Sequence, residues 1–399
     1  MTADNQTRST GIEPLMFVGG LWFVAKLARY SFPALFPTLE TSLSVSSSQL
    51  GVAYTAMMLL YSLVQFPSGA LADALEDVRV IAVGGATAAV GAIGLLLSPS
   101  YPVLVVGMLL VGLGTGVHKT VSIGLLARLY PSRTGRALGV FDTLGTVGGI
   151  VAPPAVVFAL ASIGWQVLLA VVGVVGITLT AGLLARVPRA DRDDSTVSIH
   201  RLREQLAVRP YLGPFRDRGF LLFVAVTLCF SFAYNGVVAF LPSYLVERGL
   251  TDSTAAFLYS GLFAVSVVQV VTGSLSDRLG RLPLVAAVLA IATLSLAGLV
   301  VADGTALALG VATVGLGIGS HGFRPVRAAY LSNVIPDEIA GGGLGLVRTL
   351  LMGVGATAPA IVGLVADSAS FRVAFAGLAI VMGGAIVFTA LSVLADTAA

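Results

Sequence analysis

The sequence predicts an all-α integral membrane protein with twelve membrane-spanning helices. Of its 399 residues, 56% are hydrophobic and only 11% are charged, whereas a soluble protein carries roughly 25% charged residues. Apolar runs of about 20 residues, the length that crosses a bilayer, recur along the whole chain. We expect the spans at residues 14–39, 49–72, 79–98, 102–127, 137–160, 165–187, 219–245, 253–275, 283–302, 305–332, 342–366 and 371–394.

The second half of the chain repeats the first. The residues from Gln65 to Asp73 match those from Gln269 to Asp277 at an offset of 204 positions. Such a repeat predicts two pseudo-symmetric six-helix bundles, with a binding site between them near the middle of the bilayer. We therefore expect an N-terminal bundle at 1–187, a cytoplasmic linker at 188–218 and a C-terminal bundle at 219–399.

Basic residues predict the orientation. Arginines gather in the linker and in the loops on its side, and only Arg248 and Arg372 fall in loops on the other side. By the positive-inside rule both termini are cytoplasmic, and we expect a monomer in the cell membrane. The single cysteine, Cys229, excludes an internal disulfide, and the net charge of +3 gives no indication of nucleic-acid binding.

Two cations near the middle of the first span are the strongest functional signal. Lys26 and Arg29 lie about 16 Å and 21 Å along a helix that starts at Leu15, in a hydrocarbon layer roughly 30 Å thick. Charges there are costly unless they face a cavity or a partner, so they predict a functional site. Snorkelling or an internal salt bridge is the structural alternative.

The other spans also carry more positive than negative charge, which predicts an anionic ligand. A single acid, Asp142, lies within the spans. Besides the first pair, the cations are Lys119, Arg324, Arg327 and Arg348.

The loop from Gly273 to Arg281 reads GSLSDRLGR. It resembles the signature loop of the major facilitator superfamily, G-x-x-x-D-R/K-x-G-R/K. The first copy keeps the glycine and the aspartate, but Ala74 and Glu76 replace the base and the second glycine. The resemblance implies a secondary transporter that works by alternating access. It also implies a gate, for which we expect Gly69, Asp73, Gly273, Asp277, Arg278, Arg281, Arg324 and Arg327. Arg324 and Arg327 are expected either to pair with Asp73 or Glu76 in this gate or to bind the anion.

The first span resembles helix 1 of organophosphate and organic-anion transporters within that superfamily. Arg29 lies eight residues before Pro37, where those proteins have an anion-binding arginine. Tyr234, Gln65 and Thr146 stand where phosphate exchangers have an arginine, a lysine and a histidine. These departures favour a monoanionic carboxylate over a phosphate ester. The expected substrate-binding residues are Lys26, Arg29, Tyr30, Gln65, Lys119, Tyr234, Asn235, Gln269 and Arg348.

Asp142 is the expected carrier of a coupling proton, with His118 and His321 as relays. Asp142 and Arg348 hold equivalent positions in the repeat, at an offset of 206. They are expected to face each other, to bind opposite ends of a zwitterion, or to form a static salt bridge. For the two histidines the alternative is a structural hydrogen bond.

The sequence therefore predicts a proton-coupled symporter of a small organic anion. One alternative is an exporter of amphipathic drugs or metabolites, and another is a transporter-like anion receptor that signals through the linker. No Ser/His/Asp, metal-ligand or phosphate-binding motif stands out, so we expect neither an enzyme nor a cofactor or metal.

Overall fold

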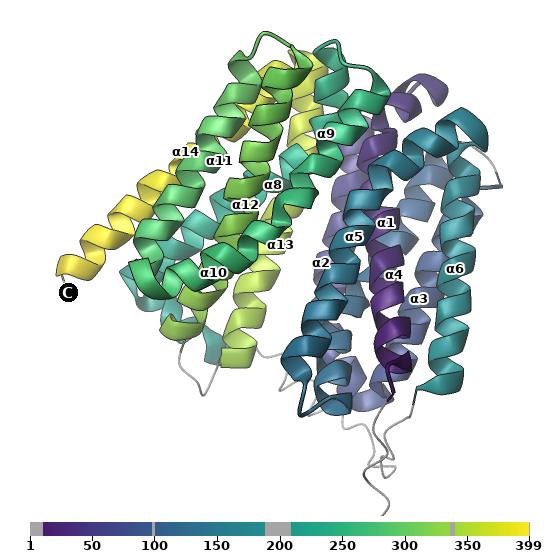
Figure 1. Ribbon diagram of the computed structural model, residues 1–399, viewed down its shortest axis with the longest axis horizontal. Helices are drawn as coiled ribbons and strands as arrows, with labels where there is room; N and C mark the ends of the chain where they lie inside the picture. The colour runs from purple at the N-terminus through teal and green to yellow at the C-terminus, as the bar shows by residue number, and fades with distance from the viewer. Residues whose placement is uncertain (1–10, 98–99, 188–208, 336–339, 399) are drawn as a thin grey trace, which may run out of the picture.

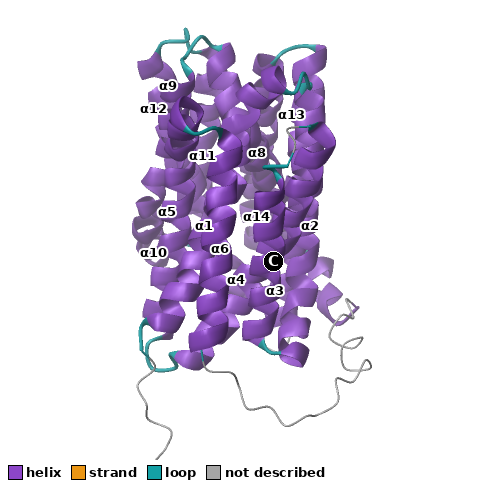
Figure 2. Ribbon diagram, turned by 90° about the vertical axis from the view of Figure 1, so that its right-hand side faces the viewer, coloured by secondary structure: helices purple, strands orange, loops and turns teal. Residues whose placement is uncertain are grey.

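The computed structural model describes residues 11–97, 100–187, 209–335 and 340–398, and these ranges contain helices but no strands. The helices run side by side (Figure 1, Figure 2). The elements are α1 (Glu13–Ser42), α2 (Ser47–Leu75), α3 (Asp77–Gly94), α4 (Tyr101–Leu129), α5 (Thr134–Ser162), α6 (Trp165–Arg186), η1 (Arg209–Arg216), α8 (Arg218–Glu247), α9 (Asp252–Ala264), η2 (Val265–Val267), α10 (Val268–Leu279), α11 (Arg281–Val301), α12 (Ala306–Val334), α13 (Ala340–Ser368) and α14 (Phe371–Ala398).

These helices form two bundles, one of α1 to α6 and one of α8 to α14, seen side by side in Figure 1. The bundles meet mainly through three helix pairs: α2 with α13, α5 with α9, and α1 with α8. Within the described residues, ten stretches of helix are long and apolar enough to cross a membrane. α1 and α2 also pack into the first bundle, which therefore has six helices. α9, η2 and α10 together form one span, so the second bundle also has six. The predicted fold of twelve helices in two bundles is confirmed.

Local sequence signals explain where several helices begin. Ser46 accepts a hydrogen bond from the backbone of Gln49, whose side chain bonds back to the Ser46 N–H, so α2 begins with a capping box. Asp217, Thr251 and Thr305 cap α8, α9 and α12 through their side-chain oxygens. Each of these residues satisfies a backbone N–H that the first helical turn leaves without a partner.

The eighth span differs from the continuous helix predicted at 253–275. A short 3₁₀ turn, Val265–Val267, separates α9 from α10. The Gln269 side chain donates to the carbonyl of Ser266, and the Thr272 hydroxyl donates to that of Val268. Polar side chains that bond to nearby carbonyls compete with regular helical hydrogen bonds. A 3₁₀ turn inside a helix is typical of a hinge, so this span is built to bend.

We call the end of the molecule where α1 begins, α6 ends and α8 begins the linker end, and the opposite end the far end. The two bundles are held together by hydrogen bonds at the far end. At the far end the Asp367 carboxylate accepts hydrogen bonds from the backbone of Ser47 (3.1 Å) and Ser48 (2.9 Å) at the start of α2. The Thr55 hydroxyl accepts from the backbone of Ala360 at 3.0 Å. We call this contact of α2 with α13 the seam.

Two glycines allow the seam to close tightly. A Cβ atom on Gly51 would overlap the carbonyl oxygen of Pro359, and one on Gly363 would overlap that of Ser47. Backbone therefore meets backbone at these points, as it does wherever small residues let membrane helices approach closely. Nearby, the Ser260 hydroxyl of α9 donates to the carbonyl of Ile150 on α5 at 3.0 Å.

Candidate functional site

The candidate site is built on one stripe of α1, which carries Trp22, Lys26, Arg29 and Tyr30. The Lys26 ammonium donates to the Tyr30 hydroxyl at 3.2 Å and lies 5.3 Å from the centre of the Trp22 ring. The Arg29 guanidinium lies 5.4 Å from the Trp22 ring and 3.9 Å from the ring of Tyr61 on α2. Aromatic faces stabilise cations in this geometry. Aromatic rings therefore stabilise both charges, and Lys26 also has a hydrogen bond to the Tyr30 hydroxyl.

Glycines on α5 make room for this stripe. A Cβ atom on Gly145 would overlap the Trp22 indole, and one on Gly149 would lie 3.2 Å from the Tyr30 ring. This glycine-rich stretch therefore lets α1 and α5 pack closely enough to position the aromatic side chains.

Lys119 and Asp142 form an ion pair within the first bundle. The Lys119 ammonium of α4 lies 2.7 Å from the carboxylate of Asp142 on α5, and 56% of the Asp142 side chain is exposed. The same ammonium lies 5.8 Å from the Trp22 ring. Asp142 was expected to face Arg348 because the two are equivalent in the repeat. In the described part of the chain its ion-pair partner is Lys119 instead.

The second bundle supplies a cation to the same region. The guanidinium of Arg324 on α12 lies 4.8 Å from the ring of Tyr234 on α8. His321 of the same helix lies 6.3 Å from the rings of both Tyr234 and Phe263, between centroids. Beside this contact the rings of Tyr30 and Phe263 on α9 pack at 4.6 Å between centroids. Side chains of α1, α8, α9 and α12 therefore meet at one level between the bundles.

Arg348 reaches the site from α13. Gln65 on α2 donates to the sulfur of Met352 at 3.7 Å, which places α13 beside α2 at this level. Arg348 lies one helical turn before Met352 on the same helix. α13 therefore brings a cation of the second bundle close to α2.

Most of the cations have no acidic partner in the described residues. The four ion pairs found there join Arg79 to Glu76, Lys119 to Asp142, Arg128 to Asp77 and Arg186 to Glu13. None of them includes the remaining cations of the spans, which are Lys26, Arg29, Arg324, Arg327 and Arg348. A positively charged region of this kind favours a negatively charged ligand.

The neutral candidates divide into two groups. The side-chain oxygens of Gln65 and Tyr234 are buried and have no hydrogen-bond partner within the described structure, so both can bind a ligand. Asn235 donates to the carbonyl of Ser231 on its own helix, and Gln269 donates within the 3₁₀ turn. The side-chain amides of Asn235 and Gln269 thus each donate a hydrogen bond within their own segment.

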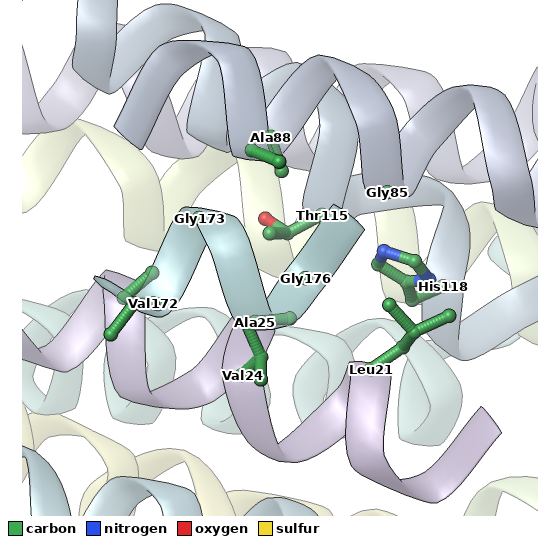
Figure 3. Close-up of a pocket in the computed structure, with 12 residues that line it drawn as sticks. Leu21, Val24, Ala25, Gly85, Ala88, Thr115, His118, Val172, Gly173 and Gly176 are labelled. Carbon is green, nitrogen blue, oxygen red and sulfur yellow. The ribbon is translucent and has the colours of Figure 1, made fainter. Parts of the chain in front are cut away.

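The two histidines lie in different surroundings. His118 and Thr115 line a small cavity among α1, α3, α4 and α6 (Figure 3), whose volume of about 20 Å³ is enough for roughly one water molecule. All residues that line it belong to the first bundle. His321 lies beside the rings of Tyr234 and Phe263, 6.3 Å from each between centroids.

In the described part of the chain, no ion pair joins the expected gate residues across the bundles. The Asp73 and Asp277 side chains lie outside the described residues. Glu76 pairs with Arg79 of its own bundle. A Cβ atom on Gly69 or Gly273 would meet only its own bundle, at 3.8 Å. The remaining residues of the set are Arg278, which is exposed, Arg281, which is half-buried, and Arg327, which lies 5.7 Å from the ring of Phe323.

Three aromatic residues of the site were not predicted to bind ligand. They are Trp22, Tyr61 and Phe263. Tyr61 lies one turn from Gln65, so helical periodicity around Gln65 would have found it. Phe263 carries no such signal, because an apolar ring in an apolar span is typical of any helix core.

The comparisons with known proteins agree with this architecture. The chain matches the family model of the Major Facilitator Superfamily over residues 20–321 and 261–398. It is 28% identical to a probable sulfoacetate transporter, SauU, of Cupriavidus necator, over 65% of this chain and 63% of the relative, so more than a third of that relative is not aligned. It is 22% identical to a hexuronate transporter of Bacillus subtilis over 95% of this chain and 92% of the relative.

Solved structures share the fold. A bacterial homologue of the human lysosomal transporter Spinster, in an inward-facing and occupied conformation, superposes with a TM-score of 0.78 at 14% identity, covering 95% of this chain and 96% of that chain. A peptide transporter, POT, in complex with sulfate also superposes with a TM-score of 0.78 at 14% identity, covering 95% and 93%. The chain belongs to the Major Facilitator Superfamily and is a membrane transporter rather than an enzyme.

Proposed function

We propose that this transporter moves a small organic anion, preferably a carboxylate, across the cell membrane together with a proton. The observation that carries the proposal is Arg29, which is buried, stacked on Tyr61, and without an acidic partner in the described residues. A buried guanidinium in this setting is stabilised by an anion that it binds in bidentate fashion. Similarity to transporters of sulfoacetate, hexuronate and galacturonate supports the same class of substrate.

The linker end is proposed to face the cytoplasm, with both termini on that side, because the basic loops gather there. The seam then lies on the external side, and the site is proposed to open to the cytoplasm. Within the described residues, no atom of the other bundle lies within 4 Å of a Cβ position at Gly69 or Gly273, which supports a cytoplasmic gate that is open in this state. We also propose that the monomer is the working unit and keep the division into 1–187, 188–218 and 219–399.

The proposed binding residues are centred on Lys26 and Arg29, with Arg348 from the second bundle. Tyr30, Gln65, Tyr234, Asn235 and Gln269 are proposed to add neutral hydrogen bonds. Gln65 and Tyr234 are the better supported of these, because their oxygens are buried without partners in the described structure. Tyr61 joins the set because it orients Arg29.

Proton coupling is proposed to work through Lys119 and Asp142. A proton on Asp142 neutralises the carboxylate and frees the Lys119 ammonium, which lies beside the cation cluster near Trp22. The freed ammonium then favours anion binding, and by linkage the bound anion favours the proton. Proton and anion thus bind cooperatively, as a symporter requires. His118 and His321 remain proposed relays, and the cavity beside His118 has room for a bridging water.

Transport by proteoliposomes tests both parts of the proposal. Loss of Arg29 removes a charge-assisted interaction worth about 1.5–3 kcal/mol, so Arg29→Ala should weaken anion counterflow about tenfold or more. Arg186→Ala is the matched control, because Arg186 is an exposed arginine at the linker end. Unchanged counterflow in Arg29→Ala would contradict the site.

Asp142→Asn should abolish uptake driven by a proton gradient while counterflow continues. Proton-driven uptake that survives this substitution would exclude Asp142 as the proton carrier. Transport of amphipathic cations instead of anions would favour an exporter of such compounds.

A further inference from the structure

We propose that the substrate carries two acidic groups, one bound by Lys26 and Arg29 of the first bundle and the other by Arg324 and Arg348 of the second. The inference rests on the proposed function and deepens it, because the sequence alone favoured a monoanionic carboxylate. In the structure, ring contacts connect Tyr30 of α1 through Phe263 and His321 to Tyr234, the ring beside Arg324, and Met352, one turn after Arg348, lies against Gln65 of α2. We call these two pairs the α1 pole and the second pole.

The two poles have different aromatic support. Arg29 lies on the ring of Tyr61 at 3.9 Å, whereas Arg324 lies 4.8 Å from the ring of Tyr234. A guanidinium stacked on a ring keeps its N–H donors directed outward from the edge of its plane, where they can bind a carboxylate, sulfonate or phosphate. A carboxylate that pairs with one guanidinium in bidentate fashion uses both of its oxygens, so a second acidic group would complete the other pole.

The two poles are nevertheless close enough to repel each other. The ring of Tyr30, which bonds to Lys26, packs on Phe263 at 4.6 Å, and His321 lies 6.3 Å from both Phe263 and Tyr234, the ring beside Arg324. Moving the bundles together would bring these like charges closer and remove water from between them, which costs free energy. An anion on one pole leaves the other pole uncompensated, whereas a substrate with two acidic groups neutralises both.

Neutral groups lie where such a substrate would lie. The Gln65 and Tyr234 oxygens are buried and have no partner within the described residues. Gln65 belongs to α2, beside the α1 pole, and Tyr234 belongs to α8, beside Arg324. A hydroxyl or a bridging carbon chain with polar substituents would be recognised there. The chemical class is thus a short dicarboxylate, sulfocarboxylate or phosphocarboxylate.

Binding to the purified full-length protein tests the proposal. At a pH where all acids are ionised, affinities would be measured by calorimetry for malonate, succinate and sulfoacetate, each with two acidic groups. Acetate, glycolate and methanesulfonate, each with one, are the matched probes. We expect the first set to bind at least about tenfold more tightly, since a second charge-assisted contact is formed.

Variants at each pole test which pole binds each acidic group of the substrate. Arg324→Gln should weaken binding of the two-acid probes about tenfold or more and change binding of the one-acid probes less than about twofold. Arg29→Gln should weaken both sets. Arg186→Gln serves as the surface control, and Arg348→Gln replaces Arg324→Gln if that variant does not fold.

The outcomes distinguish the inference from the function on which it rests. Equal affinities for the two sets, together with no effect of Arg324→Gln and Arg348→Gln, would overturn the two-pole site and leave anion transport standing. Failure of every anion to bind the wild-type protein would overturn the proposed function itself. Tighter binding of the two-acid probes that depends on both poles supports the proposal.

Discussion

At Arg29, stacking on aromatic rings takes the place of the acidic partner that a buried guanidinium usually has. The ring of Tyr61 covers one face at 3.9 Å, and the Nε donates to the Ala25 carbonyl of its own helix at 3.4 Å. Because a ring stabilises a cation without neutralising it, the net positive charge of the site is preserved for a ligand. An acid at this place would have competed with the substrate.

Replacing the ring of Tyr61 should therefore weaken anion binding. Tyr61→Leu removes the stacking on Arg29, worth about 0.5–2 kcal/mol, and should raise the Kd of an anion roughly threefold to thirtyfold. Tyr61→Phe keeps the ring and should bind within about twofold of the wild type. Calorimetric titration with a carboxylate measures both variants. Equal weakening in the two would show that the hydroxyl, and not the ring, is responsible.

Glu76 is strained by its place in the signature loop. Its φ of 84° is one that glycine adopts readily, and Gly280, its equivalent in the second copy, has a φ of 83°. A residue other than glycine in such a conformation costs about 1–3 kcal/mol. The sequence showed that glutamate had replaced the glycine, and the structure shows that the backbone kept the glycine conformation.

Glu76→Gly should stabilise the protein by about 1 kcal/mol, because it relieves this strain. The lost ion pair with Arg79 matters little, since 64% of the Arg79 side chain is exposed. Thermal unfolding in detergent measures the effect as a higher midpoint. The mirror variant Gly280→Ala should lower the midpoint, and a lower midpoint in both would show that the Glu76 side chain outweighs the strain.

At the scale of elements, contact between α1 and α5 positions the site. Gly145 faces the Trp22 indole, and Gly148 faces the carbonyl of Phe23. One turn before Gly145 on α5, Phe141 stacks on Trp22 at 5.6 Å between ring centroids. Two successive turns of α5 thus fix the ring that supports Lys26.

Gly145→Ala should disturb both stability and binding. The added methyl group would overlap the indole of Trp22, and overpacking of this kind costs about 1–3 kcal/mol. We expect a lower unfolding midpoint and a weaker affinity for anions. Gly139→Ala is the matched control on the same helix, because a Cβ atom there meets nothing within 4 Å. Similar behaviour of the two variants would argue against this packing role.

At the scale of the whole molecule, the seam holds the two bundles together at the far end. Ser46 caps α2 within its own turn, which leaves the N–H groups of Ser47 and Ser48 for Asp367 of the other bundle. A carboxylate at a helix N-terminus is also stabilised by the helix dipole. When the bundles separate, water can replace Asp367 at these groups, so the contact can be broken reversibly.

Asp367→Asn should loosen the seam, because the amide lacks the negative charge that the α2 N-terminus favours. Hydrogen–deuterium exchange should speed up at the start of α2 and the end of α13. Asp303→Asn is the control, since Asp303 bonds only within its own loop, to Thr305. Unchanged exchange in Asp367→Asn would mean that the glycine contacts alone keep the seam closed.

Much of the fold was predictable from the sequence, because apolar length and an internal repeat constrain it strongly. The α1 cations were also predictable, since charge is costly within a span. The partner of Asp142 was not, because equivalence in the repeat pointed to Arg348 whereas the chain placed Lys119 closer. The second pole was undervalued for a related reason: Arg324 was assigned partly to a gate, and helix rotation about its axis cannot be read from spacing alone.

Trp22 gives this protein a built-in fluorescent reporter. The chain has two tryptophans, and Trp22 lies 5.3 to 5.8 Å from Lys26, Arg29 and Lys119. Trp165, at the start of α6, can be replaced by phenylalanine to leave a single emitter. An anion that binds these cations changes the electric field at the indole, so its emission should follow occupancy without any attached dye. Substrate screening can then be done optically, in detergent or in lipid.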